Sequence, residues 1–99
     1  MTTYIAFLRS GPDGACTVSF PDLPGCTVCG ANAVLATALA GDELVRYLSV
    51  LLSLGEAAPP PTPETALAQD PFRGDAALLA VDVDLEMLGI AHPLHFHTL

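Results

Sequence analysis

The alternation of apolar and polar positions predicts three strands in the first third of the chain. Residues 3–9 (TYIAFLR) are rich in aromatic and β-branched side chains and stop at a group of turn-forming residues. Residues 15–20 (ACTVSF) alternate apolar with small polar side chains, which is the period of a half-buried strand. A corner rich in proline and glycine follows, and residues 26–29 then form a short third strand.

The longest predicted element is a helix over residues 33–54, which contain no proline. Asn32 is placed to cap its start and Gly55 to end it. At 100° per residue, one broad apolar stripe is formed by Leu44, Val45, Leu48, Leu51 and Leu52, continued towards the start by Thr37, Ala40 and Gly41. Leu35 and Leu39 lie off this stripe, so they add apolar surface that needs a partner.

The second half of the chain predicts a return across the domain and one more strand. Residues 58–63 form a polyproline-like linker, and Pro63 opens a short helix over residues 64–69. Residues 77–85 form the last strand. Its two faces differ, with Leu79, Val81, Val83 and Leu85 on one and Asp82 and Asp84 on the other.

This order of elements predicts an α+β fold: a βββαβ antiparallel sheet with one long helix on one face. A single helix covers only one face of a sheet, so the other face is expected to be uncovered. The length of 99 residues suits one domain, which we place at residues 1–86, with residues 87–99 as a C-terminal tail.

Composition and charge narrow the partners. Hydrophobic residues make up 52% and charged residues 14% of the chain, so we expect a homo-oligomer, either dimer or tetramer, that buries a strand edge or the uncovered sheet face. Eleven acidic against three basic residues give a net charge of -8, which disfavours direct binding of nucleic acid. An acidic surface suits a basic protein partner.

The chain carries none of the usual marks of export or membrane insertion. Its first residues lack the basic and apolar regions of a signal peptide, and its apolar stretches are too short to span a membrane. Cys16, Cys26 and Cys29 are an odd number, unlike the even sets of disulfide-bonded secreted domains. We therefore expect a cytoplasmic protein with reduced thiols.

The corner between the second and third strands carries a family motif. Phe20, Pro21, Asp22, Leu23, Pro24, Gly25 and Cys26, followed by Gly30 and a long helix, resemble the FPDLPGC signature of HicB-like antitoxins of type II toxin-antitoxin systems. The resemblance extends over residues 3–85 and implies a truncated RNase H-like fold. It also implies a HicA-like toxin partner, an mRNA interferase whose catalytic surface the antitoxin covers.

Many members of this family add a DNA-binding domain, and residues 87–99 are too short to form one. We therefore expect neutralisation without autorepression by this chain alone. The partner-binding candidates are Asp22, expected to be exposed in the corner, and Asp42 and Glu43, which lie off the apolar stripe of the helix. Pro21, Pro24 and Gly25 are interpreted as structural residues of the turn.

Two patterns leave room for chemistry. Asp82 and Asp84, together with His92, His95 and His97 in the tail, keep open the alternative of a degenerate RNase H-like or metal-binding protein. Cys26 and Cys29 form C-x-x-C but face opposite sides of a strand and have no second pair, so they are expected to pack as small hydrophobes. We predict a binding protein, with no enzyme activity, cofactor or metal.

Overall fold

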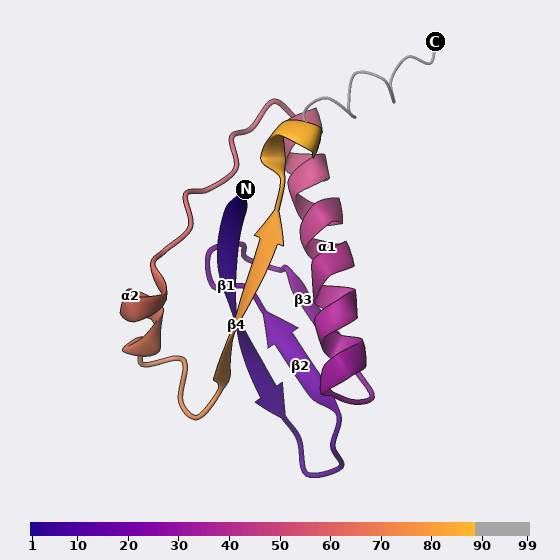
Figure 1. The fold of residues 1–99 in the computed structure, drawn as a ribbon, viewed down its shortest axis with the longest axis vertical. Helices are drawn as coiled ribbons and strands as arrows, with labels where there is room; N and C mark the ends of the chain where they lie inside the picture. Colours follow the sequence, from indigo (N-terminus) through magenta and orange to yellow (C-terminus); the bar gives the residue numbers. More distant parts are fainter. Residues whose placement is uncertain (89–99) are drawn as a thin grey trace.

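The computed structural model describes residues 1–88. Its helices and strands follow the predicted order, with one short helix between the proline-rich linker and the last strand (Figure 1). In chain order they are β1 (Thr2–Ser10), β2 (Cys16–Ser19), β3 (Thr27–Gly30), α1 (Ala33–Ser53), α2 (Glu64–Ala68) and β4 (Ala77–Val83). None of the helices within residues 1–88 is long and apolar enough to cross a membrane.

The four strands form one antiparallel sheet in the order β3-β2-β1-β4. β1 is the longest strand and lies between β2 and β4, with Phe7 opposite Ser19 on one side and Tyr4 opposite Val81 on the other. A chain that forms three strands, crosses by a helix and returns must place its last strand beside the first or the third. Here it lies beside β1, which places β4 at one edge of the sheet.

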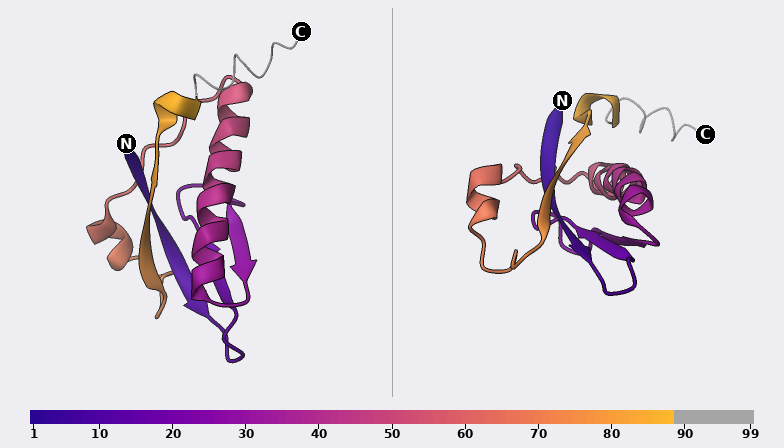
Figure 2. Two further views of the ribbon diagram at one scale, coloured as in Figure 1. Left: turned by 45° about the vertical axis from the view of Figure 1, so that its right-hand side comes forward. Right: turned by 60° about the horizontal axis from the view of Figure 1, so that its bottom comes forward.

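Helix α1 packs on one face of the sheet and encloses the main core (Figure 2). Its buried residues recur every four positions: Ala36, Ala40, Leu44 and Leu48. The predicted stripe was therefore too broad, because Thr37 and Val45 are exposed and Leu51 and Leu52 only half-buried. Asn32 caps the helix as expected, its side-chain oxygen accepting a hydrogen bond from the Leu35 amide at 2.9 Å.

The second face of the sheet is partly covered, contrary to expectation. Leu67 of α2 and Ala76, just before β4, pack against Ile5 and Phe7 of β1 and form a smaller core. The proline-rich linker carries the chain to this face (Figure 1). The five-residue helix α2 therefore covers part of the sheet that we expected a second subunit to cover. Over β2 and β3 the described structure leaves this face to small side chains, among them Ser19.

The last strand is shorter than predicted. β4 ends at Val83, and a helical turn over residues 85–88 follows it, so Leu85 is not a strand residue. Asp84 starts this turn, since its carboxylate accepts hydrogen bonds from the amides of Glu86 and Met87 at 3.1 and 3.3 Å. The alternation of apolar and polar residues does not show whether Asp84 is the last strand residue or a helix cap. Its hydrogen bonds from the two amides identify it as a cap.

Candidate partner-binding surface

The FPDLPGC corner is a compact turn that returns the chain from β2 to β3. The amide of Leu23 donates to the carbonyl of Phe20 at 3.0 Å, and the amide of Cys26 donates to the carbonyl of Leu23 at 2.9 Å. Gly25 has a φ of 86°, where a residue with a side chain would be strained. Leu23 is completely buried in the main core. The structural interpretation of the corner is consistent with this geometry.

Asp22 is not the exposed contact residue that the sequence led us to expect. Its side chain is half-buried, and its carboxylate accepts two hydrogen bonds from Thr62, from the amide at 2.7 Å and from the hydroxyl at 2.6 Å. Charge-assisted bonds of this kind are stronger than neutral ones. Asp22 therefore ties the corner to the proline-rich linker, while a contact with a partner stays a prediction.

Two tyrosines attach the same region to the rest of the domain. The hydroxyl of Tyr4 donates to the carbonyl of Pro59 at 2.5 Å, and that of Tyr47 on α1 donates to the carbonyl of Pro24 at 2.8 Å. Burial, and in addition the nearby Asp22 carboxylate, raise the pKa of Tyr4. The Tyr4 phenol therefore stays a protonated donor, and the two hydrogen bonds attach the linker to β1 and the corner to α1.

Asp42 and Glu43 are neighbours on α1 in different situations. Asp42 is exposed. Glu43 is bound by Arg46 through two hydrogen bonds, at 2.8 Å from Nε and 2.5 Å from Nη2, and its side chain is only 19% exposed. The hydrogen bonds from Arg46 lower the pKa of Glu43. Of the two, Asp42 presents its charge outward, while Glu43 shares its charge with a cation of the same helix.

Around Asp42, the outer surface of α1 carries more apolar side chains than a solvated helix needs. Leu35 is 49% exposed, and Leu39 and Val45 are 43% exposed each. Leu35 and Leu39 are thus exposed, as their places off the predicted stripe led us to expect, while their need for a partner stays a prediction. The Arg46 side chain, 61% exposed, lies one turn from Asp42 on the same helix. Exposed aliphatic side chains in such number favour an interface over a surface that stays in water.

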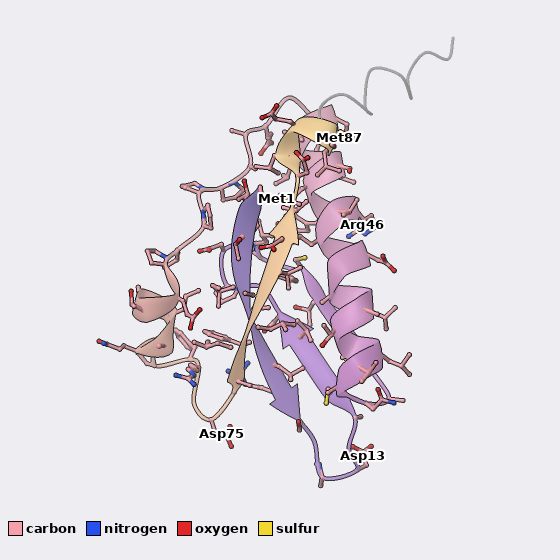
Figure 3. All side chains as sticks on the ribbon, viewed as in Figure 1. Met1, Asp13, Arg46, Asp75 and Met87 are labelled. Atoms are coloured by element: carbon pink, nitrogen blue, oxygen red, sulfur yellow. The ribbon has the colours of Figure 1, made fainter. Side chains whose placement is uncertain are left out.

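All three arginines form hydrogen bonds to other groups of the domain. Arg9 donates to the carbonyls of Phe72 and Arg73, the latter at 3.1 Å. Arg73 donates to the carbonyls of Ala76 and Ala68 at 2.9 and 3.0 Å. Figure 3 shows Arg46 at the side of α1, where it pairs with Glu43. The Arg46 side chain is nevertheless 61% exposed.

The alternative chemical site is not assembled as expected. Asp82 lies on β4, where its carboxylate accepts a hydrogen bond from the Thr3 hydroxyl at 2.5 Å, but Asp84 lies beyond the strand as a cap. The expectation that both carboxylates project from one strand face is therefore wrong. No group of three potential metal ligands occurs in residues 1–88. His92, His95 and His97 lie outside the described residues.

The C-x-x-C cysteines also differ from expectation. Cys26 belongs to the corner rather than to β3 and is completely buried, whereas Cys29 on β3 is exposed. The prediction of buried packing thus holds for Cys26 and is wrong for Cys29. Burial is the main cause that raises the pKa of Cys26 to about 11. Cys29 keeps an accessible thiol, 3.6 Å from the Thr17 hydroxyl.

One surface feature escaped the sequence reasoning. A shallow pocket of about 340 Å³ opens on the second face of the sheet, with Phe7, Phe20, Pro21 and Phe72 among its walls. Phe72 is 83% exposed although it is a large aromatic side chain. In the sequence, Phe72 stands alone among turn-forming residues. A turn has no regular alternation of apolar and polar positions, so the direction of the Phe72 side chain could not be inferred.

The fold and this surface together describe a small α+β domain: a four-stranded antiparallel sheet with a long helix on one face and an acidic surface. Residues 4–92 match the model of the family described as HicB_like antitoxin of bacterial toxin-antitoxin system. Because this match covers most of the chain, the protein belongs to the HicB-like antitoxin family. The prediction made from the FPDLPGC motif is confirmed.

Solved structures of HicB antitoxins have the same fold. The N-terminal domain of Burkholderia pseudomallei HicB aligns with 84% of this chain and 99% of its own, at 21% identity and a TM-score of 0.77. The full B. pseudomallei antitoxin gives 87% and 66% coverage, 23% identity and a TM-score of 0.78. A chain from the HicA3 and HicB3 toxin-antitoxin complex aligns with 84% of this chain and 99% of its own, at 23% identity and a TM-score of 0.70. No curated protein matches the sequence.

Proposed function

We propose that this chain is an antitoxin domain that binds a HicA-type mRNA interferase and neutralises it by covering its active surface. The observation that carries the proposal is the family match over residues 4–92. The likeness to a chain of the HicA3 and HicB3 complex supports a HicA-like partner for this fold. The role is one of binding rather than of catalysis.

The charge of the domain supports a protein partner. The net charge is -8, and the three arginines are engaged by backbone carbonyls or by Glu43. Such a surface repels phosphate and attracts a protein that is itself basic because it binds RNA. Occupying the toxin's cationic RNA-binding surface would exclude RNA from it, so neutralisation needs no chemistry by the antitoxin.

We assign the contact to the outer surface of α1 around Asp42. This carboxylate is exposed and is flanked by exposed Leu35, Leu39 and Val45. Exposed aliphatic side chains around a carboxylate can contribute apolar contact area to an interface, while the charge steers a basic partner to it. Glu43 supports this surface by holding Arg46 against the helix, and Asp22 supports it from further away by fixing the corner to which Tyr47 is bound.

A charge reversal on α1 tests the assignment. The HicA-type toxin that copurifies with this protein from its host is prepared in a catalytically inactive form, and its affinity for Asp42→Lys is measured by calorimetry. We expect a loss of at least about tenfold, because a cation would then face a basic partner. Asp75→Lys is the matched control: Asp75 is exposed, carries the same charge and lies in the loop before β4. Equal affinity of both variants and the unmodified chain would remove α1 from the interface.

The remaining expectations follow from the same role. We propose action in the cytoplasm, where the toxin meets mRNA and where the three free cysteines remain reduced. We also propose that the chain self-associates, since large apolar side chains such as Val34, Leu54 and Phe72 are exposed within residues 1–88. That this chain alone does not bind nucleic acid, that the domain ends at residue 86 and that the fold is related to RNase H all stay predictions.

A further inference from the structure

The proline-rich linker shows a pattern of exposure with a period of three residues. Pro59 and Thr62 are half-buried against the domain. The residues between and after them are exposed: Pro60, Pro61 and Pro63. Positions 59 and 62 are three apart, as are positions 60 and 63, so the linker turns one edge inward and the others outward.

This period is that of a polyproline II helix. Proline fixes φ near about −65°, and each residue before a proline is held in the extended region of ψ. Pro63 has φ −60° and ψ 148°, which are polyproline II values. No peptide bond is cis within residues 1–88. A polyproline II helix has about three residues per turn, so residues 59–63 form a short and rigid left-handed segment.

One edge of this segment is fastened to the domain. The hydroxyl of Tyr4 donates a hydrogen bond to the carbonyl of Pro59. Three residues further on, the amide and the hydroxyl of Thr62 both donate to the carboxylate of Asp22. Both anchors therefore lie on the inward edge. The segment is ordered before it meets a partner, so binding does not incur the entropy loss of ordering it.

The outward edges offer the groups that an aromatic groove recognises. Pro60 and Pro63 are exposed and have the P-x-x-P spacing that such grooves bind. No backbone N–H in residues 1–88 donates to the carbonyls of Pro60 or Pro61. These carbonyls can therefore accept a hydrogen bond from the indole N–H of a tryptophan or the hydroxyl of a tyrosine. A groove lined by such aromatic side chains fits the two outward edges.

The charge around this segment is negative. Glu56 lies before it and Glu64 directly after it, and both are exposed. The sequence between Arg46 and Arg73 contains no basic residue. A groove with a basic rim is therefore attracted, whereas a second copy of this chain, which also has a net charge of -8, is repelled. Figure 1 shows the linker running down the α2 side of the sheet, with α1 on the other side, so a protein bound there leaves Asp42 accessible.

We propose that residues 59–63 are a docking segment for a second protein partner, one that binds polyproline II in an aromatic-lined groove with a basic rim. The inward edge holds the segment in place, and the outward edges supply its prolines to the groove. This partner is distinct from the toxin, whose contact we assign to α1. The linker thus connects two parts of the fold and also presents a rigid ligand to another protein.

The test uses isotope-labelled SH3 and WW domains as probes, because both bind polyproline II in aromatic grooves. Domains with basic and with acidic rims are included. When the unmodified chain is added at about 1 mM, the tryptophan indole signals of domains with basic rims should shift in NMR spectra. The double variant Pro60→Ala/Pro61→Ala should bind at least about tenfold more weakly, since it loses a ring from each outward edge and regains backbone freedom.

Pro12→Ala is the matched control and should bind like the unmodified chain, because Pro12 is also exposed but lies in the turn between β1 and β2. Circular dichroism verifies the fold of each variant. Unshifted indole signals in every domain, or equal affinity of the double variant and the unmodified chain, would overturn the proposal. A shift only in domains with acidic rims would overturn the assignment of a basic rim.

Photo-crosslinking in the host then identifies the partner. Pro61 is replaced by the crosslinker benzoylphenylalanine, and Pro12 is replaced in the control. We expect capture of a protein other than the toxin, which in purified form binds Pro60→Ala/Pro61→Ala at least about tenfold more weakly than the unmodified chain. Capture of the toxin alone, of a second copy alone, or of nothing beyond the control would overturn the proposal. Neither experiment measures neutralisation of the toxin, so this inference and the proposed function can fail independently.

Discussion

The carboxylate of Asp22 holds Thr62, forty residues further along the chain, by two hydrogen bonds of 2.7 and 2.6 Å. It thereby fixes the start of the FPDLPGC turn to the end of the proline-rich linker. The linker passes from the helix-covered face of the sheet to the other face, and this contact holds it two residues before α2 begins (Figure 1). The aspartate of the family motif thus has a structural role, in which it connects two distant segments of the fold.

Replacing Asp22 with Asn should destabilise the domain. The amide can accept only through one oxygen and carries no charge, so we expect the free energy of unfolding to fall by about 1 to 2 kcal/mol. Urea unfolding followed by circular dichroism measures the change. Asp75→Asn serves as the control, because it removes the same charge from an exposed loop. Equal stability of the two variants would show that the contact with Thr62 contributes nothing.

Two glycines should respond in opposite directions to the same substitution. At Gly30, a Cβ would lie 2.5 Å from the Ala36 nitrogen, and the obstacle is backbone that cannot move aside, so Gly30→Ala should cost at least about 2 kcal/mol. At Gly41 inside α1, a Cβ meets no atom within 4 Å, so Gly41→Ala should stabilise by about 1 kcal/mol. Thermal unfolding of both variants decides, and a stable Gly30→Ala would contradict the close packing of β3 on α1.

The order of elements and the antiparallel sheet could be predicted from the sequence because they rest on local signals. The alternation of residues 15–20, the cap at Asn32 and the rigid proline-rich linker each depend on neighbours in the chain. The cover of the second sheet face could not be predicted. It depends on Leu67, one apolar residue in a five-residue helix, meeting Phe7 sixty residues earlier.

The candidate site was predicted with less success, for a related physical reason. Sequence reasoning treated Asp22 as exposed because aspartate is usually solvated, whereas a distant threonine supplies both of its donors. Asp84 was placed on a strand face because its neighbours alternate, yet its carboxylate caps a helical turn. The role of a polar residue depends on hydrogen-bond partners far along the chain or on the local backbone. The pattern of hydrophobic residues predicts neither of these.

The three thiols should differ strongly in reactivity. Cys29 is exposed, Cys16 is buried, and burial raises the pKa of the Cys26 thiol to about 11. Since the thiolate is the reacting species, iodoacetamide at pH 8 should modify Cys29 first and Cys26 only after unfolding. Peptide mapping by mass spectrometry at increasing times measures the order. In urea the three rates should converge. Early modification of Cys26 in the native state would contradict its place in the core.

The antitoxin role is tested most directly by measuring the RNA-cleaving activity of the HicA-type toxin that copurifies with this protein, while increasing amounts of this protein are added. We predict that cleavage falls in proportion to the protein added and ends at a fixed stoichiometric ratio, since covering the active surface blocks one toxin per binding site. Asp42→Lys should require more protein for the same inhibition, and Asp75→Lys should not. Undiminished cleavage in the presence of excess folded protein would contradict the proposed role as an antitoxin.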